Sequence, residues 1–172
     1  MKIGFVFLLT SALSLSAPPL LAQVKPVDCT TSAVHRQFDF WVGEWEVTDF
    51  TSKGHVGESR VTGILKGCVL LEEWTGAQGG NGKSLNFVNL STGKWEQQWT
   101  MDTGNSAHYV GGMRGGAMVV EGENITPAGK KNLSRMTFTP QADGTVRQMG
   151  EGSDDAGKTW RKTFDFLYRR KI

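Results

Sequence analysis

One glutamate in this sequence has neighbours that would place it in an apolar environment. In the segment LLEEW, residues 70–74, an extended chain puts Glu72 on the same face as Leu70 and Trp74. If that face points inward, the carboxyl group is buried and needs a hydrogen-bonding partner or a raised pKa. If the face points outward, Glu72 is an ordinary surface glutamate, and the sequence leaves both orientations open.

Three other side chains are candidates for acid–base chemistry or for stabilising negative charge. His108, in the segment AHYVGGMRGG, could act as a general base or a haem ligand if it lies in a cavity. An exposed or hydrogen-bonded histidine is the commoner alternative. Arg114 and Arg135 could stabilise negative charge, although arginine usually lies at the surface. With Glu72 as acid or base, these residues would suit a cyclase, an isomerase or a lyase.

The same region also predicts a binding pocket without catalysis. In the segment KWEQQWTM, alternation with a period of two places Trp95, Gln97 and Trp99 on one face. Gln97, Arg135 and Gln148 are candidate polar groups that would orient a ligand among aromatic rings. The predicted ligand-binding residues are Glu72, Trp74, Gln97, Trp99 and His108.

Several common catalytic and metal-binding patterns are absent from the sequence. It contains no G-x-S-x-G, no H-x-E and no H-E-x-x-H, and no two histidines stand two residues apart. We therefore expect no metal site and no cofactor. The glycine-rich segment GAQGGNGK lacks a Walker pattern and precedes a predicted strand, so we expect a hairpin loop there.

The N-terminus predicts export. Residues 1–22 combine Lys2, a mostly apolar run, two prolines and Ala22 before a possible cut, which is typical of a signal peptide. The run is short of the ~20 residues that a membrane-spanning helix needs. The mature chain would be one domain, residues 23–172, periplasmic or secreted, without a membrane anchor. Without Lys2 it has 18 Lys and Arg against 17 Asp and Glu, so nucleic acid is not expected as a partner.

The two cysteines, Cys29 and Cys68, are the only ones in the chain. In an exported protein such a pair predicts a disulfide, with two free buried thiols as the alternative. The bond would tie the N-terminal lead to the third predicted strand.

Clusters of glycine and polar residues divide the chain into short segments rich in Val, Thr and aromatic residues, which predict strands. The ten expected strands cover residues 43–50, 57–66, 68–75, 83–90, 94–101, 107–114, 117–125, 133–139, 145–152 and 159–170. Short connections favour an antiparallel meander, which avoids exposed edges by closing into an up-and-down barrel. A two-sheet sandwich is the alternative. Ser32 could cap a short helical lead over residues 33–40.

Three aromatic motifs occur in order along the chain: F-x-F-W-x-G-x-W from Phe38, G-C-x-L-x-E-x-W from Gly67, and a D-x-G-K-T-W-R…F-D-F-x-Y-R-R close. With them, the chain resembles a bacterial calycin-like family of unknown function, related to the lipocalin and nitrobindin barrels. The resemblance implies that Gly43 and Trp45 form the Gly-x-Trp of the first strand and that Arg170 packs over the Trp45 ring. It implies no reaction, and no histidine follows His108 to match the haem ligand of nitrobindins.

A barrel of ten strands is wide enough to hold a small ligand. We therefore expect an exported barrel that binds a small apolar or amphipathic molecule near the predicted ligand-binding residues. Strand glycines, among them Gly150, are expected to leave room for it. An enzyme that uses Glu72 or His108 is the first alternative, and a structural or partner-binding barrel is the second.

Overall fold

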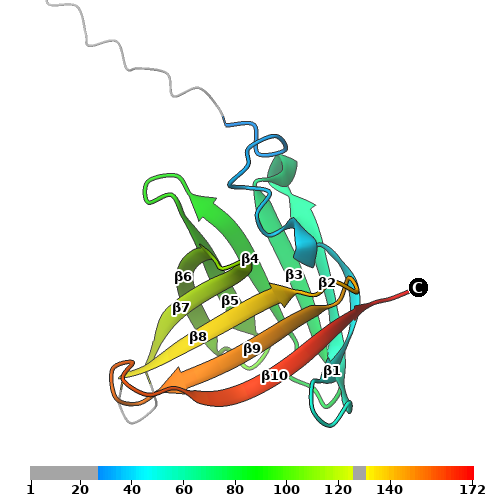
Figure 1. Cartoon of the computed structure of the whole chain (residues 1–172), viewed down its shortest axis with the longest axis vertical. Helices are drawn as coiled ribbons and strands as arrows, with labels where there is room; N and C mark the ends of the chain where they lie inside the picture. Colours follow the sequence, from blue (N-terminus) through cyan, green and yellow to red (C-terminus); the bar gives the residue numbers. More distant parts are fainter. Residues whose placement is uncertain (1–26, 126–130) are drawn as a thin grey trace, which may run out of the picture.

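The computed structural model describes residues 27–125 and 131–172, so the predicted signal peptide, residues 1–22, lies outside the described residues. Ten antiparallel strands form a closed barrel (Figure 1). The strands are β1 Gly43–Asp49, β2 His55–Ile64, β3 Val69–Gly76, β4 Gly82–Asn89, β5 Lys94–Met101, β6 Ser106–Arg114, β7 Ala117–Ile125, β8 Lys131–Pro140, β9 Val146–Ser153 and β10 Arg161–Arg170. Two 3₁₀ helices accompany them, η1 Asp39–Trp41 and η2 Leu65–Gly67.

Each strand pairs with its neighbours in the chain, and β1 pairs with β10 to close the barrel. Closure pairs the two strands that would otherwise be sheet edges. The predicted up-and-down barrel is therefore confirmed, and the sandwich alternative is wrong. In the described part of the chain, no helix is long and apolar enough to cross a membrane.

The N-terminal lead contains much less helix than expected. Residues 33–38 form consecutive turns, and only η1 is helical. The backbone N–H of Trp41 donates to the carbonyl of Phe38 at 3.1 Å, the tighter bonding pattern of a 3₁₀ turn. That turn stacks the Phe38 and Trp41 rings, whose centroids lie 4.9 Å apart. A 3₁₀ turn that buries both rings in the end of the barrel therefore stands where a longer helical segment was expected.

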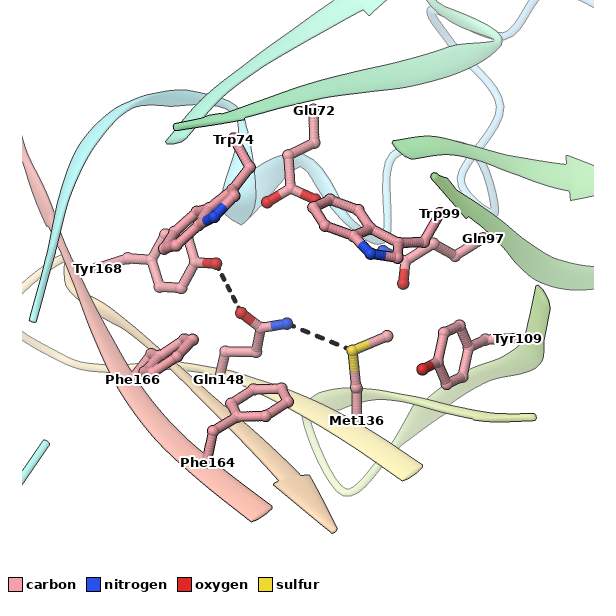
Figure 2. Close-up of a pocket in the computed structure, with 10 residues that line it drawn as sticks. All are labelled: Glu72, Trp74, Gln97, Trp99, Tyr109, Met136, Gln148, Phe164, Phe166 and Tyr168. Atoms are coloured by element: carbon pink, nitrogen blue, oxygen red, sulfur yellow. Dashed lines mark hydrogen bonds between the residues drawn. The ribbon is translucent and has the colours of Figure 1, made fainter. Parts of the chain in front are cut away.

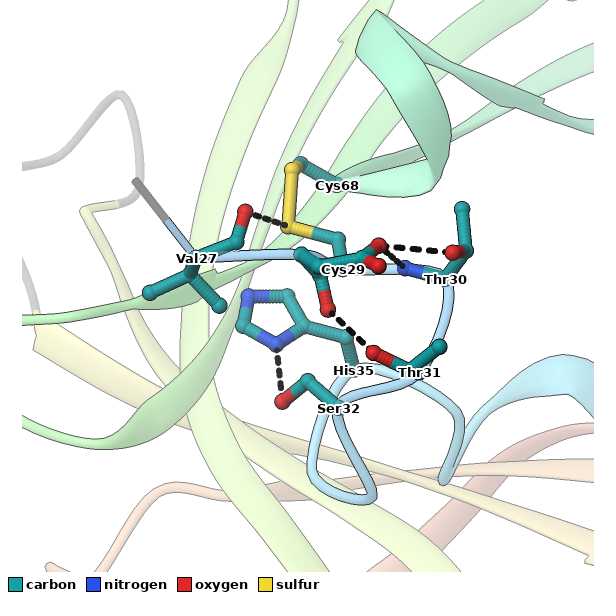
Figure 3. The surroundings of a disulfide bond; sticks show 8 residues. Val27, Cys29, Thr30, Thr31, Ser32, His35 and Cys68 are labelled. Carbon is teal, nitrogen blue, oxygen red and sulfur yellow. Dashed lines mark hydrogen bonds between the residues drawn. A yellow bond between two sulfur atoms is a disulfide. The ribbon is translucent and has the colours of Figure 1, made fainter. Parts of the chain in front are cut away.

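A disulfide joins Cys29 to Cys68, as predicted (Figure 3). Cys68 directly follows η2 and precedes β3, so the bond ties the lead to the barrel. Beside it, His35 is buried, and its Nδ1 lies 2.9 Å from the Ser32 hydroxyl. A disulfide fits an exported protein.

Trp45 is fully buried at the closed end of the barrel. Its indole N–H donates to the Trp41 carbonyl at 2.9 Å. The Arg170 guanidinium carbon lies 4.5 Å from the Trp45 ring centroid, and Arg170 donates to the Val42 carbonyl. A Cβ atom on Gly43 would lie 2.4 Å from Arg170 Nη1, so only glycine leaves space for the guanidinium. Gly43, Trp45 and Arg170 therefore lie together, in the arrangement that the resemblance implies.

Six rings pack around this point and fill one end of the barrel. We call them the aromatic plug: Phe38, Trp41, Trp45, Trp95, Phe138 and Tyr168. Each is almost completely buried, and successive rings make tilted, stacked or edge contacts with centroids 4.8–6.3 Å apart. Offset and edge contacts of this kind add stability beyond the buried area. The plug closes this end and leaves the adjoining part of the interior less filled.

The register of β10 shifts between Lys162 and Phe164, which is a β-bulge. The bulge adds a residue and so reverses which side chains point inward. Phe164 and Phe166 therefore face the interior with Tyr168, whereas Trp160 packs under Arg135 outside, 4.1 Å from its guanidinium carbon to the ring centroid. Alternation with a period of two would by itself place Trp160 and Lys162 on the face of Phe164, and the bulge is the reason that they lie outside.

Candidate functional site

Next to the plug the barrel holds a cavity of about 280 Å³ (Figure 2). This volume is near the lower end of the range for small-molecule sites. Its walls are mostly aromatic and come from six strands: Glu72, Trp74, Gln97, Trp99, Tyr109, Met136, Gln148, Phe164, Phe166 and Tyr168.

Period-two alternation brings four of the five predicted ligand-binding residues to this wall. On β3, Glu72 and Trp74 point inward, and on β5 Gln97 and Trp99 do. Glycines on neighbouring strands make space for these rings, because a Cβ on Gly82 would lie 2.5 Å from Trp99. Gly150 likewise lies against the Phe164 ring, so the space beside this glycine is filled, although the sequence predicted that it would stay open.

Glu72 is 5% exposed, and its carboxylate points into the space between the Trp74 and Trp99 rings (Figure 2). Ser59 on β2 and Ser84 on β4 donate hydroxyl hydrogen bonds to its two oxygens, at 3.1 and 2.9 Å. Burial raises the pKa of Glu72 from 4.5 to about 7, although the two serine bonds oppose the shift. Glu72 therefore titrates near neutral pH.

A chain of hydrogen bonds determines the direction of the Ser84 bond. Asn86 donates to the Leu70 carbonyl at 3.2 Å, which identifies its amide nitrogen, and the same nitrogen donates to Ser84 Oγ at 2.9 Å. The Ser84 hydroxyl therefore accepts a hydrogen bond from Asn86 and donates one to Glu72. On the far side, Gln97 donates to Asn86 Oδ1 at 2.8 Å. The bonds from Gln97 to Asn86, from Asn86 to Ser84 and from Ser84 to Glu72 all donate in the direction of the carboxylate, an arrangement that suits its ionised form.

The opposite wall carries uncharged polar groups among its aromatic rings. The Tyr168 hydroxyl donates to Gln148 Oε1 at 2.6 Å, and Gln148 Nε2 lies 3.4 Å from the Met136 sulfur (Figure 2). Ser134 donates to the Tyr109 hydroxyl at 3.0 Å. These bonds hold the wall in place. Glu72 is the one carboxylate among the residues that line the cavity.

Three predicted site residues do not line the cavity and lie on the outer face of the barrel. His108 is half-exposed on the outer face, where its Nε2 lies 3.0 Å from Glu96. Arg114 pairs there with Glu121, and Arg135 pairs with Glu151. The sequence left open which face of β6 points inward, and in the structure Tyr109 points inward and His108 outward.

Sequence reasoning missed several lining residues and the serine bonds to Glu72. Tyr109, Met136 and Tyr168 line the cavity. For Tyr109 a signal existed, because a large aromatic residue on a two-faced strand usually takes the buried face. Ser59 and Ser84 carried no such signal, because only the register of β2 and β4 against β3 brings them to Glu72.

Within residues 27–125 and 131–172, no group of three or more His, Cys, Asp or Glu side chains could hold a metal ion. No protein-family model matches the chain, and no curated protein matches it. The geometry of the cavity is therefore the main indication of function.

Glu72 should make the stability of the protein depend on pH. With a pKa near 7 in the folded chain and 4.5 as the ordinary value, the folded state keeps a proton that the unfolded chain releases between these pH values. The free energy of unfolding should therefore rise as the pH falls from 8 to 5, by about 2–3 kcal/mol at ~1.4 kcal/mol per tenfold change. Urea unfolding at constant ionic strength measures this rise.

Glu72→Gln should remove most of this dependence, because an amide does not titrate between pH 5 and 8. Its oxygen can accept from Ser84 and its nitrogen can donate to Ser59, so the side chain keeps both partners. Glu73→Gln is the matched control, since Glu73 lies on the outer face of the same strand and pairs with Lys83. It should keep the wild-type dependence. An equally steep rise in Glu72→Gln and in the wild type would mean that Glu72 does not titrate as a buried group.

Proposed function

We propose that this protein is an exported small-molecule-binding barrel that holds a small, largely apolar ligand, with Glu72 and Gln97 as polar anchors. A barrel of this kind is consistent with ligand binding. The observation that carries the proposal is the cavity of about 280 Å³, whose mostly aromatic wall contains a single buried carboxylate. Sites for small molecules commonly combine an apolar wall with a few fixed polar groups.

The location outside the cytoplasm belongs to the same proposal. The Cys29–Cys68 disulfide supports it, since such bonds persist mainly in oxidising compartments. The contacts among Gly43, Trp45 and Arg170 support the calycin-like resemblance.

Binding fits the cavity better than catalysis does. Glu72 has the pKa of a useful acid or base. Its partners, however, are two serines on the adjacent strands, and the lining residues include no Arg, Lys or His that would stabilise negative charge in a reaction. With His108, Arg114 and Arg135 on the outer face, the predicted catalytic set is divided by the barrel wall.

A contact quencher tests both the binding and its place. Bromocyclohexane is neutral and apolar, and its bromine quenches tryptophan fluorescence only at short range. We expect saturable quenching with one molecule bound per chain. Trp99→Phe, which keeps an apolar wall, should lose a large part of the quenching amplitude.

The control is Trp160→Phe, since Trp160 packs under Arg135 on the outer face. This variant should keep the amplitude of the wild type. Absence of saturable quenching, or equal amplitude in Trp99→Phe and the wild type, would contradict binding in the cavity.

A further inference from the structure

We propose that the cavity selects a small organic cation, a protonated amine on an apolar body, over neutral and anionic molecules of the same shape. This inference rests on the proposed binding function and adds the chemical class of the ligand. Three independent features of the wall support it: its charge, its free hydrogen-bond acceptors and its aromatic faces.

The first feature is an uncompensated negative charge. Glu72 is the only carboxylate among the lining residues, and no cationic side chain lines the cavity. The strands beside Glu72 contribute uncharged groups, Ser59 from β2 and Ser84 and Asn86 from β4. Tyr168 faces it from β10, and its pKa is raised by burial and, to a smaller extent, by Glu72. A buried carboxylate without a cation is costly, so a cationic ligand would supply the missing partner.

The second feature is a set of acceptors that face the cavity. An ionised carboxylate accepts about four hydrogen bonds, and the serines supply two to Glu72. Gln97 is 3% exposed, and its amide nitrogen is held by Asn86, so its Oε1 turns to the cavity (Figure 2). That oxygen accepts no hydrogen bond from any described residue. An ammonium group has three donors and no acceptor, so it matches these oxygens.

The third feature is the ring faces around the carboxylate. Trp74 and Trp99 flank Glu72, and Trp74 stacks on Phe166 with centroids 6.0 Å apart (Figure 2). Phe164 in turn stacks on Phe166 at 4.7 Å. Aromatic faces attract cations, most strongly where water is excluded, and tryptophan does so best. A wall of such rings repels an anion and gains less from a neutral group.

Matched ligands separate this inference from simple apolar binding. The probes are 2-phenylethylamine, propylbenzene, in which a methyl group replaces the ammonium group, and 3-phenylpropionate, which carries the opposite charge. Isothermal titration calorimetry at pH 8, where Glu72 is mainly ionised, should give at least tenfold tighter binding of the amine than of propylbenzene. The anion should bind more weakly than either.

Glu72→Gln should lose most of the advantage of the amine and keep the affinity for propylbenzene within about twofold. Glu73→Gln, on the outer face of the same strand, should bind all three probes as the wild type does. Thermal unfolding of each variant checks that it is folded. Lowering the pH to 5 should weaken amine binding in the wild type because Glu72 then carries a proton.

Three results would overturn the inference. If propylbenzene binds the wild type as tightly as the amine does, or if 3-phenylpropionate binds most tightly, the cavity does not select cations, while binding itself remains supported. If none of the three probes binds the folded wild type, the proposed binding function fails together with the inference.

Discussion

Trp45→Ala should lower the free energy of unfolding by about 3–5 kcal/mol, the range for a large aromatic residue removed from a core. Trp45 is fully buried, lies edge-on to Tyr168 with centroids 6.2 Å apart, and donates a hydrogen bond to the Trp41 carbonyl. The Arg170 guanidinium would also lose the ring on which it packs. Urea unfolding, monitored by far-UV circular dichroism, gives the difference.

Trp160→Ala provides the control for this prediction, because Trp160 is only partly buried and packs on the outer face. Its loss should cost about 1 kcal/mol or less, the usual scale of an exposed cation–π contact. A cost below about 1 kcal/mol for Trp45→Ala would contradict the role of the aromatic plug as the stabilising end of the barrel.

Replacing both Cys29 and Cys68 with alanine should destabilise the protein by about 4 kcal/mol. The bond joins residues 39 positions apart, and the chain-entropy model gives this value for a closed loop of that length. Without the bond, the unfolded chain gains freedom, and the lead is held to the barrel by its packing against the core, in which Phe38 and Trp41 are buried, and by nearby hydrogen bonds. The midpoint of urea unfolding should fall accordingly. Alanine is preferred to serine, because serine at position 29 would bury a hydroxyl group.

The wild-type protein after reduction under denaturing conditions and refolding with a thiol reductant should match the alanine variant. Oxidised wild type should show no reactive thiols when titrated in denaturant. Two titratable thiols per chain would contradict the disulfide. A loss of stability below about 1 kcal/mol in the alanine variant would mean that the lead docks equally well without it.

The two ends of the interior differ in how completely their buried groups are matched by partners. The aromatic plug and the disulfide hold the lead across one end, and every ring of the plug is packed against another. Beyond it, the cavity keeps a carboxylate buried and lacks a cation to match it. Burying such a group costs stability, and binding sites are where proteins commonly retain costs of this kind.

The sequence by itself determined the strands and their connections. Glycine clusters marked the turns, alternation marked two-faced strands, and the ten observed strands lie within a few residues of the expected ones. Local chemistry is sufficient here, because turn residues and period-two patterns act over a few neighbouring residues. The cysteine pair and the Gly43-x-Trp45 motif likewise pointed to contacts that the structure contains.

Only the tertiary structure decided which face of each strand points inward. Alternation separates His108 from Tyr109 but does not say which of them is inside, and the bulge at Lys162–Phe164 reverses the faces within one strand. The hydrogen bonds to Glu72 likewise depend on register, since Ser59 and Ser84 come from strands paired on either side of β3. Such contacts join residues 12 or 13 positions apart across two successive hairpins, and a shift of one residue in either register would turn the serine to the other face of the sheet.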